Sequence, residues 1–143
     1  AFFNFGNKRP FTLSFWTKLG DGNGCYVTTR NTSIYAPFEL SRGALFFIGN
    51  DTLSNWVFAP FTVNNTNWTH VALVADGSRI KGYKQGVAQF DIAHPNWPSA
   101  NLPLIFGKNG DNNYSDGSLD DFLLYDGVLW TENFSPPEMA FSV

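Results

Sequence analysis

The stretch 68–87, WTHVALVADGSRIKGYKQGV, predicts two neighbouring β-strands and the turns that bound them. Residues 68–75 form an almost unbroken apolar run with β-branched members, which the turn residues 76–78 interrupt. Such a run is typical of a strand that is covered on both faces. Residues 79–84 alternate charged with other side chains, and a glycine turn at 85–86 follows them. A buried strand beside a more exposed one indicates a β-sandwich.

Other segments of the chain support this interpretation. The segment 11–18, FTLSFWTK, alternates strictly and places Phe11, Leu13 and Phe15 on one face, which predicts a half-buried strand. Short candidate strands separated by Gly, Pro, Asn and Asp residues recur roughly every 8–12 residues, a spacing typical of all-β sandwiches. No long segment has the 3.6-residue apolar period of a helix. We therefore expect residues 1–143 to form a single all-β domain, as a fragment or subunit of something larger.

Composition narrows the possible functions. Aromatic residues make up 17% of the chain and charged residues only 15%, which favours a well-packed domain over a disordered one. The net charge of −3 gives no basic footprint for nucleic acid. No apolar run approaches the ~20 residues that a membrane-spanning helix needs.

Three stretches, taken together, resemble successive landmarks of one family. They are FTLSFWTK at 11–18, WTHVALVADGSRIKGYKQGV at 68–87, and PLIFG followed by DGSLDDFLLYDGVLW within 103–130. Their order and spacing resemble the laminin-G-like, concanavalin A-like jelly-roll family, which implies a sandwich of two antiparallel sheets. The second strand of the 68–87 hairpin departs from the family pattern at Gly82 and Lys84. This departure predicts a smaller or wetter core beneath the hairpin.

The chain ends in a segment that resembles a narrower group of proteins. Residues 130–138, WTENFSPPE, are similar to the closing segment of laminin-G-like domains in phage structural proteins. The resemblance implies a virion surface protein, such as a fibre, decoration or tail subunit.

The sequence argues against an enzyme. Glycanases on this fold carry carboxylates at alternating positions of one strand. The only glutamates are Glu39, Glu132 and Glu138, and none forms such an arrangement. Asp120 and Asp121 are adjacent, so their side chains are expected on opposite faces of a strand. No nucleophile–base pair or phosphate-binding loop is suggested.

A polar loop near the C-terminus is a candidate calcium site. Residues 108–117 are rich in Asn and Asp, and Ca²⁺ prefers several oxygen ligands. The family resemblance implies that calcium is sometimes bound near the Leu119-Asp120-Asp121 strand. The candidate metal ligands are Asp111, Asp116, Asp120 and Asp121. The alternative is that these acids cap turns.

Glycan binding is the favoured activity. Sugar rings stack their C–H faces on aromatic side chains, and their hydroxyls require hydrogen-bond partners. Aromatic and amide residues in the expected loops provide both. The candidate glycan-binding residues are Trp97, Tyr114, Asn112, Asn113 and Trp56, of which Trp97 and Tyr114 are the best candidates for exposed rings. The alternative for Trp97 is a loop anchor that packs on the sandwich.

These observations predict a non-enzymatic recognition or structural module, placed extracellularly or on a virion surface. Its expected partners are glycans or neighbouring subunits, and a homo-oligomer is one arrangement. One alternative is a carbohydrate-binding or adhesion module of a secreted cellular protein. The other is a structural capsid or appendage subunit without a ligand.

Overall fold

The computed structural model describes residues 2–18, 25–30, 37–41, 45–62, 67–99, 101–108 and 114–139. Regular secondary structure within these ranges consists of strands only, as the sequence predicted. None of the described segments forms a helix long and apolar enough to span a membrane. The strands are β1 (Phe2–Asn4), β2 (Phe11–Lys18), β3 (Cys25–Thr28), β4 (Phe38–Ser41), β5 (Leu45–Gly49), β6 (Trp56–Thr62), β7 (Thr69–Ala75), β8 (Arg79–Lys84), β9 (Val87–Ala93), β10 (Asn101–Pro103), β11 (Ile105–Phe106) and β12 (Ser118–Tyr125).

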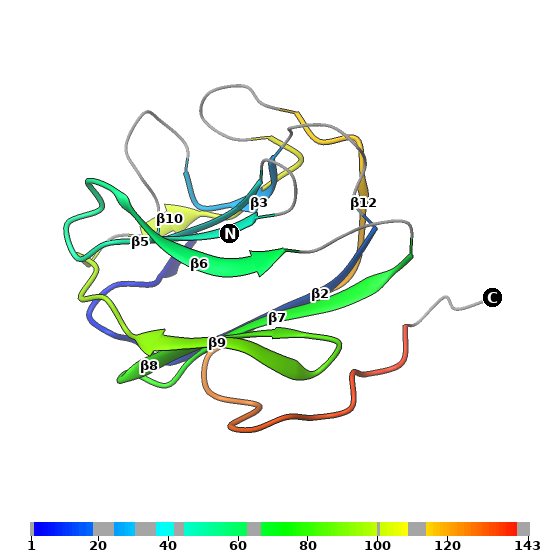
Figure 1. The fold of residues 1–143 in the computed structure, drawn as a ribbon. Coiled ribbons are helices and arrows are strands. Elements are labelled where there is room, and N and C mark those ends of the chain that lie inside the picture. The colour runs from blue at the N-terminus through cyan, green and yellow to red at the C-terminus, as the bar shows by residue number, and fades with distance from the viewer. Residues whose placement is uncertain are drawn as a thin grey trace.

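Two five-stranded sheets face each other and enclose the core (Figure 1). One sheet has the strand order β11-β3-β4-β5-β6, and the other has the order β12-β2-β7-β8-β9. All pairings within the two sheets are antiparallel. β1 and β10 form a separate small pair. The two-sheet antiparallel architecture expected from the sequence is therefore present.

The core fills with aromatic and aliphatic side chains from both sheets. Phe11, Leu13 and Phe15 of β2 are at most 1% exposed and face it, as the alternating pattern predicted. Phe38 and Leu40 of β4 meet them from the opposite sheet. The many aromatic side chains buried in this core account for much of the high aromatic content.

The outer face of β2 is also buried, so the prediction of a half-buried strand was wrong. Thr12 and Ser14 point away from the core, yet they are 0% and 2% exposed. Their cover is the C-terminal strap, which we define as residues 126–139. The strap runs along the outside of the sheet that contains β2, and it is the orange-to-red segment in Figure 1.

Hydrogen bonds hold the strap to three strands and one turn of this sheet. The Thr12 hydroxyl donates to the Gly127 carbonyl (2.8 Å) and accepts from the Leu129 N–H (3.1 Å). The Phe134 N–H donates to the carbonyl of Gly86 in the β8–β9 turn (2.9 Å). Two further bonds join Lys81 Nζ to the Thr131 carbonyl and the Ala88 N–H to Asn133 Oδ1. A polar-looking strand can thus be buried by a segment distant in sequence.

The β7–β8–β9 meander confirms the interpretation of stretch 68–87. Every residue of β7 is buried, as expected for a strand covered on both faces. Gln85 and Gly86 both have positive φ, 51° and 73°, as a two-residue hairpin turn requires. The predicted loose core under Gly82 was wrong, because the Phe90 ring of β9 fills that space. A Cβ atom at Gly82 would lie 2.1 Å from Phe90 Cε1, so only glycine leaves room for the ring.

Candidate functional site

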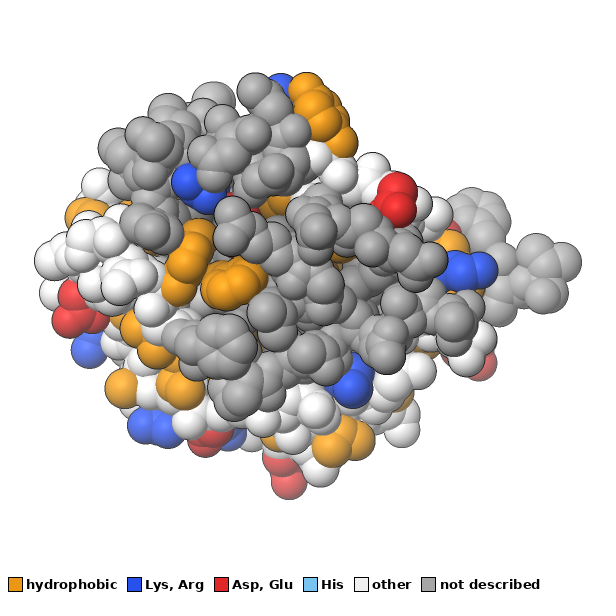
Figure 2. All heavy atoms as spheres, turned by 45° about the horizontal axis from the view of Figure 1, so that its top comes forward, with side chains coloured by type: hydrophobic (Ala, Val, Ile, Leu, Met, Phe, Trp, Pro, Cys, Tyr) orange, Lys and Arg blue, Asp and Glu red, His pale blue; other side chains and the backbone are white. Residues whose placement is uncertain are grey.

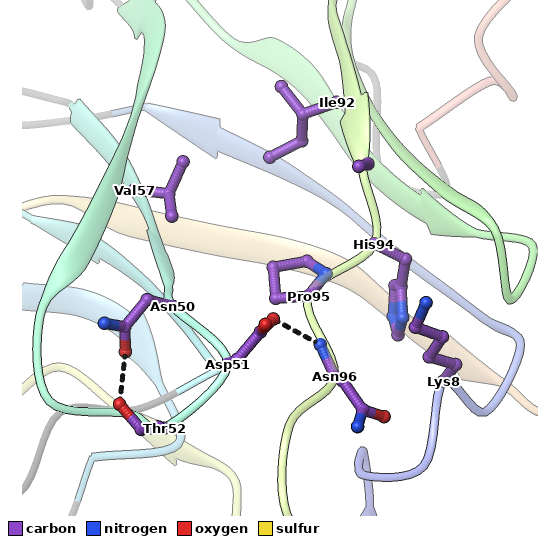
Figure 3. Close-up of a pocket in the computed structure, with 10 residues that line it drawn as sticks. Lys8, Asn50, Asp51, Thr52, Val57, Ile92, His94, Pro95 and Asn96 are labelled. Carbon is purple, nitrogen blue, oxygen red and sulfur yellow. Dashed lines mark hydrogen bonds between the residues drawn. The ribbon is translucent and has the colours of Figure 1, made fainter.

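A groove opens at one edge of the sandwich, where the β5–β6 turn approaches the segment that follows β9 (Figure 3). Its volume is about 620 Å³, the size of a small-ligand pocket. The groove is lined by Lys8, Asn50, Asp51, Thr52, Val57, Ile92, Ala93, His94, Pro95 and Asn96.

The β5–β6 turn is rigid because Asn50 organises it. Its side-chain Oδ1 accepts hydrogen bonds from the Ser54 N–H (2.9 Å) and the Thr52 hydroxyl (3.3 Å). Its carbonyl accepts from the N–H of Leu53, which has a positive φ of 54° and inserts its side chain into the core. Polar groups on this turn are therefore held in place before a ligand arrives, which lowers the entropy cost of binding.

The opposite wall is tied to both sheets. The His94 N–H donates to the Ser78 carbonyl (2.9 Å), and the Asn96 N–H donates to Asp51 Oδ1 (2.7 Å) across the groove. The buried Trp97 indole donates to the Gly49 carbonyl (2.8 Å). The Ser78 bond holds the start of the His94–Asn96 segment to the β7–β8 turn, and the other two bonds hold it to the end of β5.

His94 is the chemically distinctive residue of the groove. Its side chain is only 3% exposed, and neither ring nitrogen has a hydrogen-bond partner among the described residues. Burial, and to a lesser extent the nearby Lys8 ammonium, lower its pKa to about 4 against the opposing effect of Asp76. At neutral pH the imidazole is therefore uncharged, with one nitrogen that donates and one that accepts. Figure 3 shows the ring beside Lys8.

The groove is apolar on one side and polar on the other. Val57 and Ile92 lie together at one end, and Pro95 continues the apolar wall (Figure 3). The polar groups come from the β5–β6 turn, Lys8, His94 and Asn96. An apolar wall facing several hydrogen-bonding groups suits a ligand that has both a C–H surface and hydroxyls.

The predicted glycan-binding residues do not gather in this groove. Trp97 is 1% exposed and packs against His94, so it offers no open stacking face and is instead the packed loop anchor that the sequence left as the alternative. Trp56 is half-buried and packs on Phe47, with ring centroids 5.6 Å apart. Because Val57 lines the groove, the adjacent Trp56 faces the other side of β6.

The remaining candidate glycan-binding residues lie in or beside the polar loop at 108–117. Tyr114 is 66% exposed, as predicted. Asn112 and Asn113 lie outside the described residues.

The predicted calcium ligands are only partly described, since Asp111 lies outside the described residues. Asp121 has a positive φ of 48° and sits in a β-bulge, with its N–H bonded to Asp120 Oδ1 (2.8 Å). The Tyr26 hydroxyl lies 3.4 Å from Asp116 Oδ1. Within the described part of the chain, no three His, Cys, Asp or Glu side chains are grouped closely enough to hold a metal. The calcium site stays a prediction.

Sequence reasoning missed the groove because its walls are far apart in the chain. Lys8, the turn at 50–52 and the segment at 94–96 come together only through the sheet order. The one local signal was an Asn- and Asp-containing turn, which predicts a turn equally well without a ligand. On the face shown in Figure 2, described Lys and Arg side chains are spread over the surface, some of them beside Asp or Glu side chains.

Comparisons with known proteins agree with this architecture. A family model described as the concanavalin A-like lectin/glucanases superfamily matches residues 3–133. A search of curated proteins by sequence found no match.

Solved structures share the fold at low sequence identity. Domain 4 of an extracellular GH43 arabinanase from Geobacillus stearothermophilus, solved with arabinotriose, has a TM-score of 0.66 and 20% identity, and the match covers 90% of this chain and 68% of that one. The binding domain of Paraclostridial Mosquitocidal Protein 1 has a TM-score of 0.63 and 19% identity, with 88% and 36% covered. The botulinum neurotoxin serotype D ligand-binding domain, solved with N-acetylneuraminic acid, has a TM-score of 0.62 and 15% identity. That match covers 85% of this chain and 34% of the toxin domain. This chain thus spans about a third of each toxin domain. The jelly-roll fold predicted from the sequence is confirmed.

Proposed function

The chain belongs to the concanavalin A-like lectin/glucanases superfamily, and we propose that it is a non-enzymatic carbohydrate-recognition module whose ligand occupies the groove at His94. The observation that carries the proposal is a groove in which the apolar side chains of Val57 and Ile92 face the polar groups of Lys8, Asp51 and Asn96. The His94 ring lines the same groove, although both of its nitrogens are buried.

The other groove residues suit a sugar as well. The Lys8 ammonium and the Asn96 amide supply donors, and the carboxylate of Asp51 keeps acceptor capacity beyond its bond to the Asn96 N–H. Val57 and Ile92 would contact the C–H face of the ring. Two fold relatives were solved with arabinotriose and with N-acetylneuraminic acid, which supports saccharides as the ligand class.

The test is a glycan array read with the wild-type chain and one groove variant. Asn96→Ala removes a side-chain amide that makes no hydrogen bond among the described residues, so folding should be unaffected. We expect the wild type to bind at least one glycan class and the variant to lose about tenfold in affinity. Gln89→Ala, exposed on β9 outside the groove, is the matched control. Two results would contradict the proposal. The wild type binds no glycan, or Asn96→Ala binds as tightly as Gln89→Ala.

Placement of the module on a phage particle or another extracellular surface is a finer proposal. It rests on the resemblance of residues 130–138 to phage structural proteins. Within this segment Phe134 and Trp130 anchor the strap, so the segment also has a structural role. Mass spectrometry of purified virions tests the placement, and sedimentation tests whether the chain assembles with copies of itself. A protein absent from every particle preparation would contradict the virion assignment.

A further inference from the structure

A second groove lies at the far end of β9 from the first. It is formed where the end of the C-terminal strap passes the β8–β9 turn, and its volume is about 610 Å³. Gln85 lies in the turn before β9 on this side, and His94 directly follows β9 on the other, so the two grooves are separated by roughly 20 Å. The second groove is lined by Trp16, Gln85, Pro136, Pro137, Glu138 and Met139.

Trp16 supplies an aromatic wall. It projects from the outer face of β2, is partly exposed, and packs one edge against His70 with ring centroids 5.4 Å apart. Its indole N–H is buried and has no partner among the described residues, so the ring rather than the N–H is available to a ligand. The strap prolines add further apolar surface beside it.

Gln85 is held so that only its amide nitrogen remains available. Its backbone N–H donates to the His70 carbonyl (2.9 Å), and its side-chain Oε1 accepts from the His70 N–H (2.9 Å). Nε2, with two N–H donors, has no bond among the described residues. The adjacent Gly86 fixes this turn against the strap, since a Cβ there would lie 1.8 Å from the Phe134 carbonyl oxygen. The donor is therefore preorganised at the groove wall.

Glu138 completes the set with an exposed carboxylate on the strap. We propose that this groove is a second saccharide site, which takes a neutral sugar ring against Trp16. Ring hydroxyls accept hydrogen bonds from Gln85 Nε2 and donate to the Glu138 carboxylate. The carboxylate disfavours an acidic sugar through like-charge repulsion.

The same chemistry argues against a proline-rich peptide as the occupant. Peptide carbonyls need donors between paired aromatic ridges. Among its described lining residues this groove has one aromatic side chain, a carboxylate that requires donors, and an indole N–H that is out of reach. A polyhydroxylated ring can stack on the single aromatic side chain and donate to the carboxylate, and it does not need the indole N–H. With sites at opposite ends of one strand, the module would engage a glycan surface at two points and gain avidity.

The experiment is a site-resolved NMR titration with a panel of neutral methyl glycosides (glucoside, galactoside, mannoside and arabinoside). The Trp16 indole and Gln85 side-chain amide resonances report the second groove. The His94 imidazole and Asn50 side-chain amide resonances report the first. We expect at least one glycoside to shift the Trp16 and Gln85 resonances in the wild type and in Asn96→Ala. Glu138→Ala should weaken this second response about tenfold while the first groove responds unchanged.

The outcomes separate the two sites. Trp16 and Gln85 resonances that no glycoside moves, or shifts that Glu138→Ala leaves intact, would overturn the second site. Shifts at Trp16 and Gln85 that disappear in Asn96→Ala would also overturn it, because they would be an indirect effect of the first groove. A response at Trp16 and Gln85 with none at His94 would support the second site and contradict the proposed function of the first. Glu132→Ala, on the strap outside both grooves, is the control.

Discussion

Two histidines in this protein share their burial but not their surroundings. His70 and His94 are 1% and 3% exposed, their ring nitrogens lack partners among the described residues, and burial lowers the pKa of each to about 4. His70 is enclosed by aromatic rings, with Trp130 and Phe134 at 6.0 and 5.9 Å between ring centroids. His94 instead lines an open groove next to Lys8.

The difference separates a packing role from a binding role. Beneath the strap, the His70 ring contacts the stacked Trp130–Phe134 pair, and His70 lines neither of the two grooves described above. The nitrogens of His94 are buried too, but its ring lines an open groove in which a ligand can lie. Burial and pKa alone therefore do not distinguish a functional histidine, whereas the space beside it does.

We expect the largest effect from substituting Phe134, which anchors the strap, and the effect is on the free energy of unfolding. Phe134→Ala removes the 3.9 Å stack with Trp130 and the contacts with His70 and Tyr83. We expect a loss of about 3–5 kcal/mol in the free energy of unfolding, measured by urea denaturation. Glu132→Ala, exposed on the same strap, should change it by less than about 0.5 kcal/mol. Equal effects from both variants would show that the strap does not cover a core.

Acid tests the two histidines together. Because the folded-state pKa of each is lowered from 6.5 to about 4, the unfolded chain binds more protons between these values. Stability is therefore complete above pH 6.5 and falls as pH drops towards 4, by about 3 kcal/mol for each histidine. His70→Phe and His94→Phe should each remove one such contribution, seen as a flatter melting temperature between pH 7 and 4. An unchanged pH profile in both variants would contradict burial as the cause.

A groove charge should affect binding alone. Lys8 has a positive φ of 52°, which Asn tolerates, so Lys8→Asn preserves the backbone. We expect about a tenfold loss of glycan affinity by calorimetry, with stability within about 0.5 kcal/mol of the wild type. Lys18→Asn, exposed at the end of β2, is the matched control. If the control loses as much affinity as Lys8→Asn, general charge attraction rather than the groove explains binding.

The smallest expected effect concerns calcium. If Asp111, Asp116, Asp120 and Asp121 bind it as the sequence predicts, saturating calcium should raise the melting temperature by about 2–4 °C. Asp116→Asn should abolish the rise, and EDTA should reverse it. A melting temperature that is the same in calcium and in EDTA would contradict the predicted calcium site.

The fold was predictable because its signals are local. The apolar run of β7, the glycine turn at 85–86 and the alternation in β2 each identify a strand or a turn within a few residues. Their combination also identified the family. The cover over Thr12 and Ser14 was not predictable, since it depends on the strap lying against a strand more than a hundred residues earlier.

The candidate site was less predictable for the same physical reason. An exposed aromatic in a loop was a reasonable platform, but the Trp97 ring is drawn inward by its bond to the Gly49 carbonyl. The groove residues carry no local pattern of their own. Their proximity follows from the pairing order of the two sheets, which a sequence without its structure does not display.

The most direct test compares the two histidine variants in binding at pH 7. Glycan affinity would be measured by calorimetry with a glycan that the wild type binds on the array. We predict that His70→Phe binds like the wild type, because its ring is enclosed beneath the strap, and that His94→Phe loses at least about tenfold in affinity. Equal affinity of the two variants, or a loss confined to His70→Phe, would contradict the assignment of the groove at His94 as the glycan site.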